Sequence, residues 1–379
     1  MKTTKLMLSA FIAAVALVAC NKEDHTPVKT DVMSMTISLE NAIMTRGAST
    51  GDIVSGSQVQ VNNLHIRLLD DHGNTYKAYV LNGDGTVTEA DMYLDFTSSA
   101  IPSKIEYHYV DPAVTKVVAY ANLGANVNWD EYNGDIVIED EQNPDALALY
   151  GEDAQLTNAG EKTHDNGDVT VLYKAELTLC PRISRFELDG FRIAFTDEEP
   201  NYGTINISKV AFQNYYPASN VVTGVESGTL LNPITNLEND FLVFDWFNNT
   251  GATPGIDEWY WDNVNANLIK DAPAVETNYS YHFFSCGEVP VMVIDIVADG
   301  RPAYLYTKSF SVKDDNGNYV TLDKIEEGKV YRMNAASTAD GNDDGYVEIP
   351  EDLIDPANHC IDITVTVENW VVKLVQPNF

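Results

Sequence analysis

An alternation of apolar and polar residues recurs along this chain and predicts β-strands. The first clear example is residues 33–39, where apolar residues alternate with serine and threonine. A period of two with one apolar face is typical of a half-buried strand. Its apolar face consists of Met33, Met35, Ile37 and Leu39. Similar segments are found at residues 59–69, 76–81, 116–123, 169–178, 182–195, 205–212, 240–247, 279–284, 289–297, 303–312, 329–334 and 361–368.

Turn-forming residues separate these segments and indicate an all-β fold. Asn82-Gly83-Asp84-Gly85 is the strongest local hairpin signal. Asp165-Asn166-Gly167-Asp168 predicts a turn into the strand at 169–178. Residues 144–156 are the one segment that we expect to be helical. Many short strands with regular turn signals are typical of β-sandwiches, and not of folds in which strands and helices alternate.

The length of the chain indicates more than one domain. Its 379 residues are too many for one ordinary sandwich and suit two. A complete set of strands precedes Cys180-Pro181 and a new apolar run follows, so we place a boundary there. We therefore predict two antiparallel β-sandwich domains of the transthyretin-like, Greek-key kind, at residues 47–180 and 181–379.

The N-terminal residues have the pattern of a secretion signal that ends in a lipid-attachment site. Lys2 and Lys5 precede an apolar run at 6–18, which is too short to span a bilayer as a helix. Small residues followed at once by Cys20 match the bacterial lipobox, in which the cysteine receives lipid. We predict a signal peptide and lipobox at residues 1–20, and thus a lipoprotein precursor of the outer membrane.

Charge and motif content argue against several classes of function. The formal net charge of -34 opposes binding to nucleic acid, whose phosphates are also negative. The seven histidines are scattered, with no H-E-x-x-H or G-x-S-x-G motif, so we predict no enzyme and no catalytic cofactor. Any fold can bring two carboxylates together, but the acidic pairs here lie in turn-like stretches and favour solvated loops.

Three cysteines follow Cys20, and they indicate no metal site. They allow one disulfide at most and leave an odd thiol. They also lack the C-x-x-C spacing of zinc sites. We favour small buried hydrophobic residues as the interpretation of Cys180, Cys286 and Cys360.

The last predicted strand changes phase partway along. Apolar residues occupy every second position from Ile361 to Val367, and the pattern slips at Asn369. Trp370, Val372 and Leu374 then continue it. A slip of one residue moves side chains to the opposite face of a sheet, so the two halves are expected to have different surroundings. A long apolar strand at a chain end also favours edge pairing with another molecule.

An acidic segment at 340–351 matches the calcium-binding loop of EF-hands at every specified position. The flanks differ from an EF-hand, because 329–334 predicts a strand and Pro350 is a poor start for a helix. An isolated structural calcium loop and a plain acidic turn therefore both stay open. In a calcium loop the oxygen ligands come from Asp340, Asn342, Asp344, the Tyr346 carbonyl and Glu351.

Several short motifs follow one another along the whole chain. They are the lipobox at Cys20, the alternating strand after it, Thr45-Arg46-Gly47-Ala48, the strand with Ala121-Asn122, Arg182-Ile183-Ser184-Arg185-Phe186-Glu187, Gly328-Lys329-Val330-Tyr331-Arg332 and Val365-Thr366-Val367-Glu368-Asn369-Trp370. In their order and spacing they resemble the fimbrillin family of Bacteroidales, the FimA-like subunits of type V pili.

The resemblance implies maturation by proteolysis and assembly by strand exchange. In that family a trypsin-like protease cuts the exported, lipidated precursor after an arginine, which implies a cut between Arg46 and Gly47 and a propeptide at 21–46. The family often has alanine where this chain has Gly47. The cut frees the strand that contains Met33, Met35, Ile37 and Leu39, and a neighbour's C-terminal strand fills the groove. The implied donor strand spans about 361–379, with Trp370, Val372, Leu374 and Phe379 as anchors.

The resulting expectation is a stalk subunit of a fimbrium at the cell surface that supports adhesion. Its expected partners are copies of itself, other pilus subunits, the maturation protease, and host or bacterial surface ligands. An anchor or tip adhesin of the same pilus is one alternative. A surface glycan-binding lipoprotein is another, although we favour packing onto the core for the aromatic residues on which it depends. These are Trp246, Phe247, Trp259, Tyr260 and Trp261.

Overall fold

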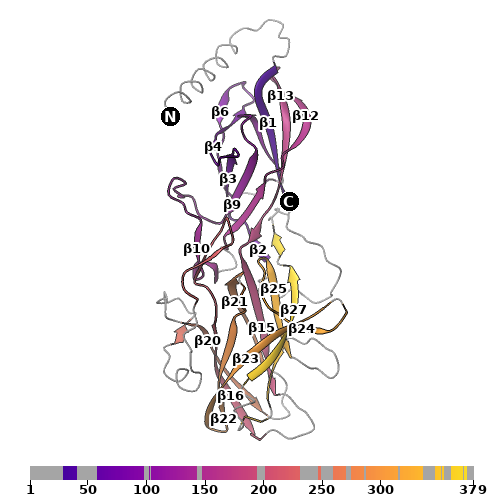
Figure 1. Ribbon diagram of the computed structural model, residues 1–379. Coiled ribbons are helices and arrows are strands. Elements are labelled where there is room, and N and C mark those ends of the chain that lie inside the picture. Colours follow the sequence, from indigo (N-terminus) through magenta and orange to yellow (C-terminus); the bar gives the residue numbers. More distant parts are fainter. Residues whose placement is uncertain are drawn as a thin grey trace.

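β-Strands dominate the computed structural model of the chain (Figure 1). The helical element in the described part is the short 3-10 helix η1, Asp140–Gln142. No helix among the described residues is long and apolar enough to cross a membrane. The structure describes residues 29–40, 58–97, 102, 104–142, 147–193, 201–230, 246–248, 259–269, 275–285, 287–314, 316–335, 346–350, 352–353, 360–369 and 371–373.

Two sheets hold the N-terminal strands. The first consists of β1 (Lys29–Glu40), β5 (Ala78–Leu81), β6 (Val87–Glu89), β8 (Lys104–Val110), β12 (Thr157–Thr163) and β13 (Val169–Thr178), in the order β12-β13-β1-β8-β5-β6. The second consists of β3 (Asn63–Leu69), β4 (Thr75–Tyr76), β7 (Tyr93–Asp95), β9 (Lys116–Ala121), β11 (Leu149–Asp153) and β14 (Cys180–Pro181), in the order β14-β11-β9-β3-β4 with β7 on β3. Both sheets contribute to one hydrophobic core, as packed layers do.

The C-terminal strands form one eleven-stranded sheet that extends away from the N-terminal sheets (Figure 1). Its strands are β15 (Ile183–Ile193), β16 (Thr204–Gln213), β19 (Trp246–Asn248), β20 (Trp259–Ile269), β21 (Val275–Phe284), β22 (Val291–Ala298), β23 (Arg301–Lys313), β24 (Tyr319–Thr321), β25 (Lys329–Ala335), β26 (Tyr346–Ile349) and β27 (Cys360–Asn369). The main order is β19-β20-β16-β22-β23-β27-β25-β15-β21, with β24 on β23 and β26 on β15. Aromatic rings fill its core, where Phe186 stacks on Tyr331 at a centroid distance of 4.9 Å.

Two small sheets join early and late parts of the chain. One consists of β10 (Asp135–Val137), β17 (Ala218–Asn220) and β18 (Glu226–Ser227). The other pairs β2 (Gln58–Gln60) in parallel with β28 (Val371–Lys373).

The predicted all-β class is confirmed, and several local predictions hold. The Gly85 amide donates to the Asn82 carbonyl at 2.9 Å in the turn between β5 and β6, and β13 begins at Val169 as expected. The predicted helix at 144–156 is wrong, because β11 occupies part of it and pairs with β9 and β14. A short, fully buried apolar run such as residues 147–150 has no period that separates helix from strand.

The sheets are mixed, whereas the sequence predicted antiparallel pairing. β1 runs parallel to β13, β25 parallel to β15, and β27 parallel to β23. β14 is the last strand that pairs with the N-terminal sheets, through Tyr150 and Cys180. The division into domains at 47–180 and 181–379 stays a prediction.

Candidate functional site

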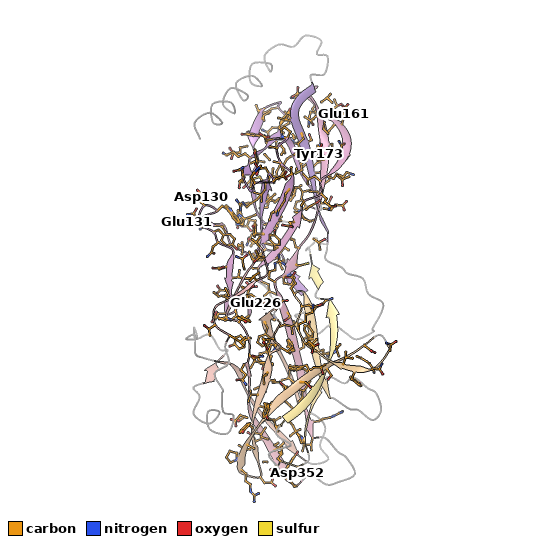
Figure 2. The ribbon with its side chains drawn as sticks, viewed as in Figure 1. Asp130, Glu131, Glu161, Tyr173, Glu226 and Asp352 are labelled. Atoms are coloured by element: carbon orange, nitrogen blue, oxygen red, sulfur yellow. The ribbon has the colours of Figure 1, made fainter. Side chains whose placement is uncertain are left out.

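The first strand, β1, is an interior strand of its sheet. It lies between β13, to which it is parallel, and β8, to which it is antiparallel. Ile37 pairs with Ala175 on one side and with Ile105 on the other. Tyr173, labelled in Figure 2, is the β13 partner of Met35. Both edges of β1 are therefore occupied, although the strand comes first in the described chain and its neighbours come much later.

The apolar face of β1 is fully part of the core. The exposed fractions of Met33, Met35, Ile37 and Leu39 are 4%, 0%, 0% and 6%. Burying each such side chain contributes roughly 1.5–3 kcal/mol relative to leaving it exposed. The four residues predicted for this face are thus confirmed as core residues.

The opposite face of β1 is also buried at Ser34 and Thr36, which the alternating pattern did not predict. Ser34 is 0% exposed and Thr36 is 2% exposed. Thr36 pairs with Glu106 of β8, whose carboxylate forms an ion pair with Lys162 of β12 at 3.0 Å. Because β13 and β1 lie between β12 and β8, this ion pair crosses over both strands. Hydrogen bonds from Lys104 and then Lys162 lower the pKa of Glu106 to about 2.

A β-bulge in β8 lies opposite Ser34. Met33 pairs with Val110 and Met35 with Tyr107, so β8 has two residues, His108 and Tyr109, where β1 has one. A bulge places an additional residue in one strand and disturbs the ladder locally. Here a side chain bonds to the backbone of the bulge, because the Ser34 hydroxyl donates to the His108 carbonyl at 2.9 Å.

Three buried polar side chains meet at this bulge. Ser34 Oγ lies 2.5 Å from Thr170 Oγ1 and 3.0 Å from His164 Nε2. His164 Nε2 also lies 2.9 Å from Thr170 Oγ1. With the Ser34 proton on the carbonyl of His108, Ser34 Oγ can accept a hydrogen bond from the Thr170 hydroxyl, and from His164 in the tautomer that has its proton on Nε2. We call Ser34, His164, Thr170 and the His108 carbonyl the hydroxyl slot.

The histidines at the hydroxyl slot are held neutral. Burial lowers the pKa of His164, and the neighbouring His108 and Lys162 lower it further, while Asp168 and Asp165 oppose the shift. Burial is also the first cause of the lowered pKa of His108, whose Nδ1 accepts a hydrogen bond from the Leu81 amide at 3.1 Å. A neutral pair is compatible with the two rings lying 5.5 Å apart.

The predicted processing residues lie outside the described residues. This is so for Cys20 at the lipobox and for Arg46 and Gly47 at the cut. Their roles stay predictions.

The predicted donor strand is divided by the structure. Residues 360–369 form β27, which lies between β23 and β25 inside the C-terminal sheet, and Ile363 is 1% exposed. Val372 lies in β28 and pairs with Val59. Trp370, Leu374 and Phe379 lie outside the described residues. The phase slip at Asn369 thus coincides with the end of an interior strand.

Of the remaining predicted sites, the structure describes only a few residues. Tyr346 is the first residue of β26 and pairs with Gly190, whereas Asp340, Asn342, Asp344 and Glu351 lie outside the described residues. Calcium binding stays a prediction. Cys180 is a free thiol whose pKa is raised by burial.

The aromatic residues of the glycan-binding alternative lie on two paired strands. β19 and β20 are parallel, with Trp246 next to Trp259 and Phe247 next to Tyr260. Trp261 follows them and pairs with Asn248. The register brings these positions together at one edge of the sheet.

A polar junction between the early and late strands was missed by sequence reasoning. Arg182 forms an ion pair with Glu327 at 2.7 Å and lies over the Tyr150 ring at 4.7 Å. Its side chain also donates to the carbonyls of Val221 and Val222, at 2.6 and 2.8 Å. Arg182 begins one of the short motifs that carry the resemblance. A sequence motif does not indicate which residues an arginine contacts in the fold.

His282 and Glu141 complete this junction. His282 Nδ1 donates to the Glu141 carbonyl at 2.6 Å, and Arg185 Nη1 donates to His282 Nε2 at 3.2 Å. Burial lowers the pKa of His282 to about 3, so the ring is neutral. The Glu141 carboxyl is buried and accepts from the Ala148 amide at 3.0 Å, and burial raises its pKa to about 8.

Comparison with known proteins gives matches among solved structures alone. No family model matches the chain, and no curated protein matches its sequence. A candidate cell adhesion protein from Parabacteroides distasonis superposes with a TM-score of 0.51 at 10% identity, covering 92% of this chain and 99% of that one. This match shows that the two chains share a fold.

Two further structures match with lower scores. A candidate cell adhesion protein from Bacteroides eggerthii has a TM-score of 0.49 at 14% identity and covers 93% of this chain and 100% of that one. A fimbrillin, FimA, from Porphyromonas gingivalis has a TM-score of 0.46 at 11% identity, with coverage of 90% and 98%. These three solved structures are described as cell adhesion proteins and a fimbrillin of Bacteroidales.

Proposed function

We propose that the chain is a structural subunit of a fimbrium, in the stalk, whose β1 is a removable placeholder. The proposal rests on the observation that β1 is an interior strand whose apolar face is in the core and whose opposite face is buried at Ser34 and Thr36. The precursor is a lipoprotein of the outer membrane with lipid on Cys20, and a trypsin-like protease cuts it between Arg46 and Gly47. The mature chain then polymerises by strand exchange with copies of itself and with other pilus subunits, and supports adhesion to surface ligands.

Removal of β1 would leave a site that has to be filled. β8 and β13 would both lose a backbone partner, and the core around Met35 and Ile37 would open to water. An unsatisfied buried polar group costs about 1–3 kcal/mol, so many such groups along one groove give a strong driving force. A donated strand restores the ladder by β-augmentation. Head-to-tail donation is a heterologous contact, which grows filaments.

The C-terminal end is suited to act as the donor. β27 ends at Asn369, and its pairing with β23 and β25 accounts for the first half of the apolar segment. The residues after it, 370–379, carry the second apolar phase with Trp370, Val372, Leu374 and Phe379. A stalk subunit needs both a groove and a donor, and this chain has the sequence features of both.

The test is the Arg46→Ala variant expressed in the native cell. We expect a folded chain that reaches the cell surface and forms no filaments, because β1 stays covalently attached and keeps the groove filled. Arg301→Ala is the matched control, since Arg301 is an exposed arginine at the start of β23. Filaments of normal number and length from the Arg46→Ala cells, seen by electron microscopy, would disprove the maturation scheme.

A further inference from the structure

Ser34 is an unusual residue for the outward side of a strand in a two-layer fold. Polar residues there normally face solvent. Ser34 and Thr170 are both 0% exposed, and His164 is 6% exposed. The hydroxyl of Ser34 joins two elements, since it bonds to the β8 carbonyl of His108 and contacts both Thr170 and His164.

The bulge explains why a hydroxyl is needed at this position. The additional residue of β8 puts the His108 carbonyl opposite a side chain of β1. A strand with an apolar side chain at this position would remove the donor to that carbonyl and the acceptor for the Thr170 hydroxyl. Water has little access to these buried groups and cannot replace the lost hydrogen bonds. Such a strand would therefore bind the groove more weakly.

We propose that the groove of β1 selects a strand with a hydroxyl side chain at the position of Ser34, and therefore prefers such a strand from another subunit to the tail of a copy of this chain. The inference rests on the proposed strand exchange and narrows the choice of donor between copies of this chain and other subunits. The bulge and the hydroxyl slot together also oppose a shift of one residue, because such a shift exchanges the two faces of the incoming strand.

The tail of this chain does not meet the requirement. With Trp370, Val372 and Leu374 facing the core, the opposite positions of residues 370–379 are held by Val371, Lys373, Val375, Pro377 and Phe379. None of these five has a hydroxyl group. β1 itself has serine or threonine at three successive outward positions, which is the pattern that the preferred partner shares.

Peptide competition tests the selectivity directly. The full-length chain, with residues 44–50 replaced by the recognition sequence of a specific protease, is cut so that β1 is held without a covalent link. Labelled peptides of residues 29–40, unsubstituted or with Ser34→Ala or Ser38→Ala, and a peptide of residues 370–379, are then compared by fluorescence anisotropy. Ser38 is the matched control, because it faces the same side but is only half-buried.

We expect the Ser34→Ala peptide and the tail peptide to bind at least about tenfold more weakly than the unsubstituted peptide, which corresponds to about 1.4 kcal/mol. The Ser38→Ala peptide should bind within about threefold of it. Equal affinity of the Ser34→Ala and unsubstituted peptides would overturn the hydroxyl requirement. A tail peptide that binds as tightly as the unsubstituted one would overturn the preference for another subunit.

A second measurement separates this inference from the proposed function. If no peptide binds in the groove, not even the unsubstituted one, the proposed strand exchange fails. The hydroxyl slot is then tested by the melting temperatures of uncut chains with the same substitutions. Ser34→Ala should then lower the melting temperature and Ser38→Ala should leave it nearly unchanged. Equal melting temperatures for the two variants would contradict the requirement for a hydroxyl group in the hydroxyl slot.

Discussion

Glu141 carries a buried carboxyl group at the junction between the early and late strands. Its exposed fraction is 3%, and burial raises its pKa to about 8 from a usual value of 4.5. The folded chain therefore binds a proton at Glu141 that the unfolded chain releases between these two pH values. Stability from this group is complete below pH 4.5 and is lost as the pH rises toward 8.

Glu141→Gln should remove this dependence. The wild-type free energy of unfolding is expected to fall by up to about 1.4 kcal/mol per pH unit on the way from pH 5 to pH 8. The amide cannot ionise, so the variant should show a much flatter profile in urea unfolding. Glu161→Gln, at an exposed position labelled in Figure 2, is the control that should keep the wild-type slope. Identical profiles for Glu141→Gln and wild type would contradict the assignment.

His164 gives a prediction on the acid side. Its pKa is lowered in the folded state, mainly by burial, so its contribution to stability is present above pH 6.5 and is lost as the pH falls. His164→Gln should make the acid loss of stability less steep, in thermal unfolding between pH 7 and pH 5. His72→Gln, at an exposed turn position, should leave it unchanged. An unchanged acid profile for His164→Gln would refute the role of this ring.

Among single residues, the apolar ones could be predicted and the buried polar ones could not. Met33, Met35, Ile37 and Leu39 follow from a period of two, because the hydrophobic effect acts on every apolar side chain alike. Ser34 looks like a solvent-facing residue in the same pattern. Its burial depends on a bulge in β8 and on Thr170, and these are far away in sequence.

The strand β1 is the element on which the account depends. Ile37 is 0% exposed and has neighbours on both sides, so Ile37→Ala should lower the free energy of unfolding by about 2–5 kcal/mol. It should also speed the release of β1 from a chain cut in the segment after it. Val87→Ala, on the exposed strand β6, is the control with an expected change below about 0.5 kcal/mol. A small effect of Ile37→Ala in urea unfolding would mean that β1 adds little to the core.

The C-terminal residues allow a matching test of the donor. Deleting residues 370–379 removes β28 and its pairing with β2, but nothing from β27, which ends at Asn369 between its two partners. We expect the truncated chain to keep the melting temperature of the full-length chain to within about 2 °C, because about 1 kcal/mol shifts the melting temperature of so long a chain by about 2 °C or less. It should fail to enter the interior of filaments on cells. Unfolding of the truncated chain would instead make the tail part of the core.

At the level of elements, strand existence was predictable but pairing was not. β13 and β9 begin at the predicted residues 169 and 116, because turn residues mark their starts. The parallel pairing of β1 with β13 joins segments more than a hundred residues apart, and no local pattern encodes it. The sequence predicts a helix where β11 lies, because a buried apolar run has no period that distinguishes strand from helix.

On the scale of the molecule, acidic residues are spread along the length of the described structure. Asp130, Glu131, Glu161, Glu226 and Asp352 mark acidic positions from one end of the described structure to the other (Figure 2). The segment proposed to be removed, residues 1–46, has nearly balanced charge, so the mature chain keeps 18 basic and 53 acidic residues and a net charge of -35. Subunits with such a charge repel one another, so backbone pairing and apolar burial have to supply the association.

The most direct measurement is the N-terminal sequence of the chain isolated from cell-surface filaments. The account predicts a single N-terminus at Gly47, because β1 has to leave before a neighbour's strand can take its place. The same filaments should contain no peptide from residues 29–40 in mass spectrometry. A chain in assembled filaments that begins at a lipid-bearing Cys20, or that retains residues 29–40, would contradict the exchange of β1.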